Sequence, residues 1–170
     1  MTNMYVQMKQ LAALLLLLLP GMAATAQDTD AVQVYVIDSV EATPYEINGL
    51  GPDQIAMITI ARGRKTVEKY GERAANGVFY IETKAFARQR YNRMFGQLSP
   101  AYAAALQKYG SDSSFLYILG GSPVTSNQES QLAALEKKDI TGIRILDAAT
   151  LKKEYDAAGK QVGVVIDIGK

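Results

Sequence analysis

Short apolar runs rich in β-branched residues recur along the chain, and they predict strands. One run surrounds Tyr35 and another surrounds Tyr117. In residues 58–60 and 143–145, isoleucines alternate with a polar side chain, which is the period-two pattern of a half-buried strand. Helical patterns of about two turns lie between these runs. The sequence therefore indicates an α+β fold.

The expected helix starts follow the first strands at matching distances. Thr43 and Thr125 each lie eight residues after the tyrosine of the preceding run. Three residues further on, the first threonine is followed by Glu46 and the second by Gln128. This is the spacing of a capping box, in which the hydroxyl and the later side chain each bind a free backbone amide. Both positions therefore predict a helix N-terminus.

A longer step also occurs twice. Ile55 is followed 15 residues later by Tyr70, and Ile140 is followed at the same distance by Tyr155. Each interval holds a strand pattern and then a helix pattern, and Asp147 is a suitable N-cap for the second of these helices. Spacings that match at independent positions predict an internal repeat.

The last strand of each repeat is expected to open at a glycine followed by valine, at Gly77 and at Gly163. The sequence thus predicts two tandem β-α-β-α-β units, residues 27–85 and residues 114–170. At roughly 50 residues, neither unit buries much apolar surface alone. We therefore expect the two units to pack together.

Residues 86–113 predict a helical linker between the units. Ser99 is an N-cap followed by proline, and Gly110 is a suitable helix stop. One helical face of the first linker helix is apolar and is expected to cover a sheet; it carries Ala87, Tyr91, Met94, Phe95 and Leu98.

The start of the chain predicts export. Lys9 precedes an apolar run from Leu11 to Leu19, and the small residues Ala24 and Ala26 follow it. Such a run is too short to cross a bilayer core, which takes roughly 20 apolar residues. Residues 1–26 therefore read as a cleaved signal peptide. A retained membrane anchor is the alternative, and no later segment is long and apolar enough to span a membrane.

Composition removes several classes of function. The chain has no cysteine, no histidine and a formal net charge of +1. Without these two residue types there is no Ser-His-Asp triad, no Cys-His pair, and no zinc site with histidine or cysteine ligands. Carboxylates, lysine, tyrosine and serine remain for catalysis, but an enzyme becomes the less favoured class, and we expect no catalytic residue, no metal and no cofactor. The near-neutral charge argues neither for nor against any partner, and nucleic acid is not expected because an exported protein rarely meets it.

The first unit carries a recognisable set of motifs. The segment "YVIDSVEATPYEINGLGPDQIAMITIARGRKTVEKYGERAANGVFYIETK", residues 35–84, resembles the plug domain of TonB-dependent outer-membrane receptors, most closely that of SusC-type receptors and free-standing plug-like modules. The second unit resembles a degenerate copy. The motif residues, to which we assign structural roles, are Asp38, Tyr70, Gly71, Asn76, Gly77, Lys84, Tyr155 and Gly163.

The chain departs from the family pattern in ways that limit what the resemblance implies. Ser39 replaces the turn glycine, and Asp156 replaces the glycine after the second tyrosine. Such receptors continue into a transmembrane barrel, and nothing in this sequence alternates over enough strands to build one. The resemblance therefore implies a fold and a compartment, the periplasm or the periplasmic side of the outer membrane, but not transport.

Three functions remain as hypotheses. The first is a non-catalytic interaction module beside an outer-membrane TonB-dependent uptake or envelope-signalling system, docking a protein through a sheet edge or through a basic helix surface. That surface would be formed by Arg88, Arg90 and Arg93, although a solvated helix face explains these residues as well. The second is a periplasmic carrier with a small-ligand pocket between the units. The third is a hydrolase that uses carboxylates.

Particular residues belong to the second and third hypotheses. The carrier's pocket is expected near Asp38, Tyr35 and Tyr117. The hydrolase would need Asp38 and Glu41 to converge in a cleft. A turn-forming role explains Asp38 equally well.

Overall fold

The computed structural model describes residues 33–169. The predicted signal peptide, residues 1–26, and the last residue therefore lie outside the described residues. Within residues 33–169, none of the helices combines the length and the apolar character that crossing a bilayer requires. The described part has an α+β fold with two similar units, each built on a four-stranded mixed sheet.

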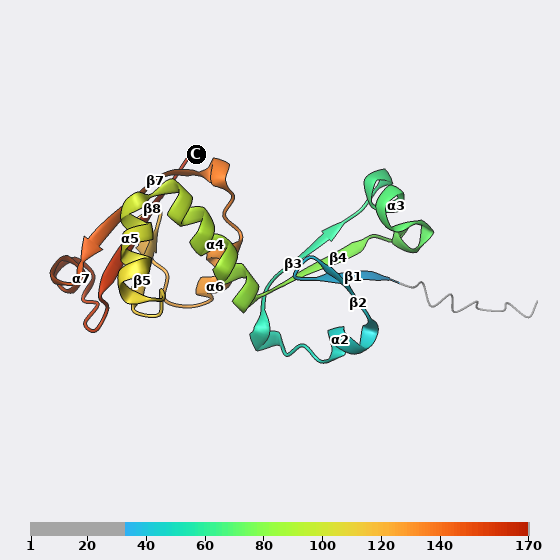
Figure 1. The fold of residues 1–170 in the computed structure, drawn as a ribbon, viewed down its shortest axis with the longest axis horizontal. Coiled ribbons are helices and arrows are strands. Elements are labelled where there is room, and N and C mark those ends of the chain that lie inside the picture. Colours follow the sequence, from blue (N-terminus) through green and yellow to red (C-terminus); the bar gives the residue numbers. More distant parts are fainter. Residues whose placement is uncertain (1–32, 170) are drawn as a thin grey trace, which may run out of the picture. The chain divides into compact units, whose positions relative to one another are not determined.

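The first sheet has the strand order β2-β1-β4-β3 (Figure 1). Its central strands run parallel, and both outer strands are antiparallel to their neighbours. The elements of this unit are β1 (Val34–Ile37), β2 (Val40–Ala42), α2 (Pro44–Asn48), η2 (Pro52–Gln54), β3 (Ile55–Ala61), α3 (Arg64–Tyr70), η3 (Glu72–Ala74) and β4 (Val78–Thr83).

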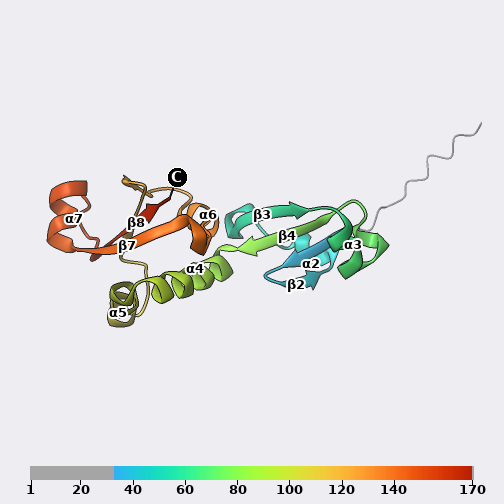
Figure 2. The same ribbon diagram turned by 90° about the horizontal axis from the view of Figure 1, so that it is seen from above.

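The second sheet has the equivalent order, β6-β5-β8-β7. Its elements are β5 (Phe115–Leu119), β6 (Ser122–Pro123), α6 (Gln128–Ala133), η4 (Lys137–Asp139), β7 (Ile140–Asp147), α7 (Ala148–Tyr155) and β8 (Val162–Ile168). Two helices, α4 (Lys84–Leu98) and α5 (Pro100–Tyr109), connect the two units. The helix α4 continues directly from β4 (Figure 2).

Strand pairing confirms the equivalence of the outer strands. Both outer strands have a register shift at the same place, after Ile55 in β3 and after Ile140 in β7. Across the first sheet, Ile60 pairs with Phe79. The match in the second sheet is Ile145 with Val164. The isoleucine positions that the sequence aligned are therefore equivalent in the structure.

The alignment of Gly77 with Gly163 is wrong by one residue. Gly163 lies inside β8 and pairs with Leu146, whereas the equivalent position in β4 is Val78, which pairs with Ala61. Gly77 lies in the turn before β4, with a φ of 111°. The two positions require glycine for different reasons. Gly77 permits the positive φ of a turn. Gly163 leaves room for α7, because a Cβ at this position would lie 2.6 Å from Cδ2 of Leu151.

Equivalent helices cover one face of each sheet. In the first unit, Tyr70 and Ala74 pack against a cluster that includes Val34, Val36 and Val78. In the second unit, Leu151 of α7 packs against the cluster of Leu116, Ile118 and Val165, together with Tyr155. The strand residues occupy matching positions. This layer is therefore repeated in both units.

The largest core lies on the other face of the second sheet. The helices α4 and α5 cover it with Tyr91, Phe95 and Tyr102, all fully buried. Beneath them lie side chains from the strands, from α6 and from the loops that flank α6: Phe115, Tyr117, Val124, Leu132, Leu135, Val162, Val164 and Ile166. The apolar helical face expected in the linker therefore covers a sheet, and that sheet belongs to the second unit.

Capping explains where several helices begin. Thr43 forms the expected capping box with Glu46, whose carboxylate accepts a hydrogen bond from the Thr43 amide at 2.7 Å. Ser99 and Asp147 cap α5 and α7 as expected. The capping box predicted at Thr125 is wrong. The N-cap of α6 is Asn127, which has a left-handed backbone conformation and makes no side-chain cap bond.

The two units contact each other through small side chains and one arginine. Ala56, Ala87 and Ala133 form a small buried cluster. Nε of Arg90 donates to Oε1 of Glu82 at 2.6 Å, and its Nη2 donates to the backbone oxygen of Ala133, also at 2.6 Å. The expectation that the units pack together agrees with these contacts.

Candidate functional site

The first sheet presents an apolar face that lies opposite the face packed against α3. The side chains on this face, which we call the open face, are Tyr35, Ile37, Ile58, Ile60, Phe79 and Ile81. They are neighbours because their strands are paired in register and alternate residues share a face. The ring centres of Tyr35 and Phe79 lie 5.4 Å apart. The strands β1, β4 and β3 thus contribute to one apolar face, on which Ile58 and Ile60 are exposed, Tyr35, Ile37 and Phe79 are half-buried, and Ile81 is buried.

The equivalent face of the second sheet is the one covered by α4 and α5. Strand pairing places Tyr117, Leu119, Ile143, Ile145, Val164 and Ile166 at the corresponding positions. Tyr117, Val164 and Ile166 are fully buried. The apolar faces of the two sheets are therefore equivalent, but the connecting helices α4 and α5 pack only on that of the second sheet.

Exposure on the first sheet reflects this difference. Ile58 is 53% exposed and Ile60 is 46% exposed on the outer strand β3, and Val40 is 69% exposed on β2, the outer strand at the opposite edge of the sheet. The short helix α2 lies on this side of the strands, away from α3 (Figure 1), but none of its residues is buried. Tyr45 of α2 is 87% exposed. Exposed apolar side chains gathered on one sheet face are typical of interaction surfaces, so this face is the candidate site.

The outer strand β3, which borders the open face, has an edge without charged side chains. Its sequence, IAMITIA, carries no charge. At the position of Thr59, the second sheet has Arg144, whose Nε donates to Oδ2 of Asp167 at 3.2 Å. Proteins protect edge strands from pairing by placing charges on them. The first unit therefore lacks a protection that the second unit has.

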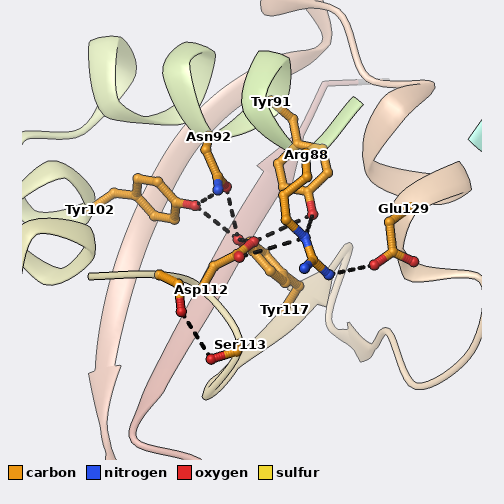
Figure 3. A network of polar contacts seen from close by, with 9 residues as sticks. Arg88, Tyr91, Asn92, Tyr102, Asp112, Ser113, Tyr117 and Glu129 are labelled. Carbon is orange, nitrogen blue, oxygen red and sulfur yellow. Dashed lines mark hydrogen bonds and ion pairs between the residues drawn. The ribbon is translucent and has the colours of Figure 1, made fainter. Parts of the chain in front are cut away.

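A polar network lies inside the second unit, beneath the connecting helices (Figure 3). The hydroxyl of Tyr117 donates to Oδ2 of Asp112 at 2.9 Å and lies 2.8 Å from the hydroxyl of Tyr102. The hydroxyl of Tyr102 donates to Oδ1 of Asn92 at 2.6 Å. The side chain of Asp112 is only 2% exposed. The network joins the turn before β5 to both helices.

Arg88 completes this network at its outer side. Its Nε lies 3.6 Å from Oδ1 of Asp112, and its Nη2 donates to Oε1 of Glu129 at 2.6 Å. The pKa of Arg88 is raised, chiefly by its hydrogen bond to Tyr91. The guanidinium therefore stays charged and balances the buried carboxylate.

The buried tyrosines are unsuited to proton transfer at neutral pH. Burial is the main cause that raises the pKa of Tyr91, Tyr102 and Tyr117 above the ordinary value of 10.0. A general base needs a pKa near the working pH. The arrangement instead supplies hydrogen bonds that fix the helices on the sheet.

The three arginines predicted as a partner surface have different environments. Arg88 and Arg90 bind acidic side chains of the chain itself, Glu129 and Glu82. Arg93 is exposed and lines a cavity of about 600 Å³ together with Arg88 and Asn92.

The motif residues of the first unit have structural contacts. Oδ1 of Asp38 accepts a hydrogen bond from the backbone amide of Thr83 at 2.8 Å. Gly71 and Gly77 have φ values of 74° and 111°, which favour glycine. The backbone oxygen of Asn76 accepts a hydrogen bond from Nε of Arg62 at 3.4 Å.

The remaining motif residues lie at helix and strand positions. Lys84 is the first residue of α4, after the strand that the sequence had expected to end there. Tyr70 ends α3, and the Tyr80 hydroxyl donates to its hydroxyl at 3.4 Å. The interaction with Lys69 lowers the pKa of Tyr70, and the hydrogen bond to Tyr70 raises the pKa of Tyr80. Tyr155 ends α7 and packs against the second sheet.

A cavity of about 590 Å³ lies between the α3 side of the first sheet and residues 133–136 at the end of α6, so it lies between the two units, as the carrier hypothesis expected. Asp38, Tyr70, Tyr80 and Arg90 contribute to its wall. Tyr35 and Tyr117, which were expected to line a pocket with Asp38, lie elsewhere: Tyr35 on the open face, and Tyr117 in the core under α4 and α5.

Sequence reasoning missed Asp112, Asn92 and the open face. Nothing around Asp112 marks it as buried, because it lies in a Ser- and Gly-rich turn. The open face could have been found, since one pair of linker helices cannot cover two equivalent faces. Comparisons with family models, curated proteins and solved structures find no match to this chain.

Proposed function

We propose that the chain is a non-catalytic interaction module that docks a partner protein on the open face of its first unit. In keeping with the sequence resemblance, the module acts in the periplasm or on the periplasmic side of the outer membrane, beside a TonB-dependent uptake or envelope-signalling system. The observation that supports this proposal is the contrast between two equivalent sheet faces, of which one is buried by helices and the other exposes Ile58 and Ile60.

The free energy of burial gives docking a driving force. Burying an exposed aliphatic side chain contributes about 1.5–3 kcal/mol. The open face exposes two such side chains, Ile58 and Ile60, both on β3, and the edge of this strand is uncharged. A hydrolase receives less support, because Asp38 is bound to Thr83 and Glu41 pairs with Arg73 at 2.7 Å.

Photo-crosslinking in intact cells tests the docking surface. A photoreactive residue replaces Ile60 on the open face, and in a control chain it replaces Arg144, an exposed residue of the equivalent strand in the second unit. We expect a protein adduct from position 60 and none from position 144. Ile58→Lys in the same chain should abolish the adduct, because a charge would be buried at the contact.

A matched variant controls for effects on the fold. Thr59→Lys introduces the same charge one residue away, on the opposite face of the same exposed strand. It should leave the adduct intact. Equal loss of the adduct in both variants, or an adduct that depends on neither, would contradict docking through the open face.

A small-ligand carrier is the second candidate. The cavity of about 590 Å³ beside Asp38 has the size of a ligand site, and it combines the apolar Val36, Met57 and Phe86 with tyrosine hydroxyls. Mass spectrometry of the protein purified from its own periplasm, under conditions that preserve complexes, checks this candidate. A bound small molecule that is lost in Tyr80→Trp would support it, and an unliganded mass would count against it.

A further inference from the structure

We propose that the element seated on the open face is an amphipathic helical pair from the partner, with an aromatic stripe and a hydrogen-bond acceptor directed at the Tyr35 hydroxyl. This inference rests on the proposed function and specifies the chemistry of the partner. It follows from the internal repeat, since the second unit shows which element covers the same face.

The apolar positions of the two faces correspond one to one. Tyr35 matches Tyr117, and Phe79 matches Val164 in the central strands. Ile58 and Ile60 match Ile143 and Ile145 in the outer strands. Apart from Phe79 and Val164, these matched positions carry the same residue type, so the covered face of the second unit shows what can pack on the open face.

The cover in the second unit is a helical pair whose contact surface is aromatic. Phe95 of α4 lies between Tyr102 of α5 and Tyr117 of the sheet, with ring centres 5.6 Å and 6.2 Å apart. Tyr91 meets Tyr117 edge to face at 6.0 Å. Edge-to-face and tilted ring contacts of this kind stabilise the packing beyond the burial of apolar area.

Among residues 33–169, no helical pair equivalent to α4 and α5 packs on the open face of the first unit. In the second unit, α6 also contributes to the covered face, through Leu132. The first unit has its own helix at that place in the chain, α2, on the open-face side of the strands (Figure 1). Since α4, α5 and α6 all contribute buried residues to the covered face of the second sheet, a helical pair beside α2 would complete the same layer in the first unit.

The hydroxyl of Tyr35 provides the polar part of the recognition. Its equivalent, Tyr117, donates to buried Asp112 and lies 3.3 Å from Oδ1 of Asn92. Tyr35 instead donates to Oε1 of Gln33 at 2.7 Å, two residues away on an exposed stretch. A helix packed on this face would surround the hydroxyl, and buried hydroxyls need a partner. The seated element therefore carries a carboxylate or amide at this position.

The chain's own helical pair is a direct probe. A synthetic peptide of residues 84–113 contains α4, α5 and Asp112. It is titrated into the exported chain with labelled isoleucine methyl groups. We expect saturable shifts at Ile58, Ile60 and Ile81, and none at Ile143 or Ile145, whose face is already covered.

Variants separate the apolar and polar parts of the contact. Ile60→Lys should abolish binding, and Thr59→Lys should leave it unchanged. Tyr35→Phe should weaken binding by about threefold to tenfold, as expected for one lost hydrogen bond. The same substitution should have no effect on a peptide in which Asp112 and Asn92 are alanine.

Several results would overturn the inference. Shifts confined to the second sheet would show exchange with the resident helices, and the absence of shifts at about millimolar peptide would show that the face does not accept them. A chain that sediments as a dimer, and becomes monomeric in Ile60→Lys, would assign the face to a second copy.

The crosslinking experiment distinguishes this failure from failure of the proposed function. If the adduct at position 60 maps to a strand or a loop of the partner, docking stands and the helical pair is wrong. If the adduct maps to an apolar helical stripe with an acidic or amide residue near Tyr35, both are supported. If no adduct forms, docking itself fails.

Discussion

The carboxylate of Asp38 holds Thr83, a residue 45 positions away in the sequence, by two hydrogen bonds. Oδ1 accepts from the Thr83 amide at 2.8 Å, and Oδ2 accepts from its hydroxyl at 2.7 Å. The Thr83 hydroxyl oxygen in turn accepts from the amide of Phe86 in the first turn of α4. The end of β1 is thus tied to the point where β4 becomes a helix.

We expect Asp38→Ala to destabilise the protein by about 1–3 kcal/mol, because it removes two hydrogen bonds from a partly buried site. The φ of Asp38 is 48°, which alanine tolerates less well than aspartate. Urea unfolding measures the change. Asp53→Ala, at an exposed position, is the control and should change the free energy of unfolding by less than about 0.5 kcal/mol. Equal effects in the two variants would show that the hydrogen bonds from Thr83 to Asp38 do not stabilise the fold.

Gly163→Ala should destabilise the second unit. The added Cβ would lie 2.6 Å from Cδ2 of Leu151 and 3.0 Å from Cβ of Leu146. Overpacking of this kind costs about 1–3 kcal/mol. Gly142→Ala in the neighbouring strand is the matched control, because its Cβ would meet Oδ2 of Asp167 at an ordinary 3.5 Å. A stability of Gly163→Ala equal to that of Gly142→Ala would show that Leu151 can move aside.

The repeat and the strand pattern were accessible from sequence because they depend on local periodicity. Isoleucines alternating with Thr59 or Arg144 mark half-buried strands wherever they occur, and equal spacing identifies two copies. The capping box at Thr43 was predictable for the same reason, since both partners lie within four residues. At Thr125 the same signal failed, because the chain adopts a left-handed conformation at Asn127 and the helix starts later.

The candidate site depended on which sheet receives the linker helices, and local patterns do not carry that information. The apolar stripe of α4 fits either sheet in principle. The hydrogen bond between Tyr117 and buried Asp112 favours packing of the linker helices on the second sheet. This contact joins residues of the folded chain and has no signature in the local sequence pattern. Asp38 was considered as a site residue because it is a polar residue at a strand end. Its structural role was missed because its partner Thr83 lies 45 residues away in the sequence.

Stability should fall at alkaline pH. Burial raises the pKa of Tyr91, Tyr102 and Tyr117 in the folded protein above the ordinary 10.0. Below pH 10 both states hold the phenol protons, so this contribution is fully present. Above it, the unfolded chain loses protons that the folded chain keeps, and stability decreases with rising pH.

Ultraviolet absorbance of tyrosinate, recorded with circular dichroism, measures this dependence. Part of the tyrosine absorbance should appear only together with unfolding, above the ordinary tyrosine pKa. In concentrated urea, all tyrosines should titrate in one step. Complete titration of the folded protein without loss of structure would show that the hydroxyls are not held neutral.

The hydroxyls of Tyr117 and Tyr35 should differ in what they contribute to stability, although they occupy equivalent positions. Tyr117→Phe removes a donor from buried Asp112, and the expected cost is about 1–2 kcal/mol. Tyr35→Phe removes only an exposed bond to Gln33, so a change below about 0.5 kcal/mol is expected. Thermal unfolding of the two variants gives the comparison. If Tyr35→Phe costs as much as Tyr117→Phe, the Tyr35 hydroxyl is already held within the isolated chain, and it is not available to a partner.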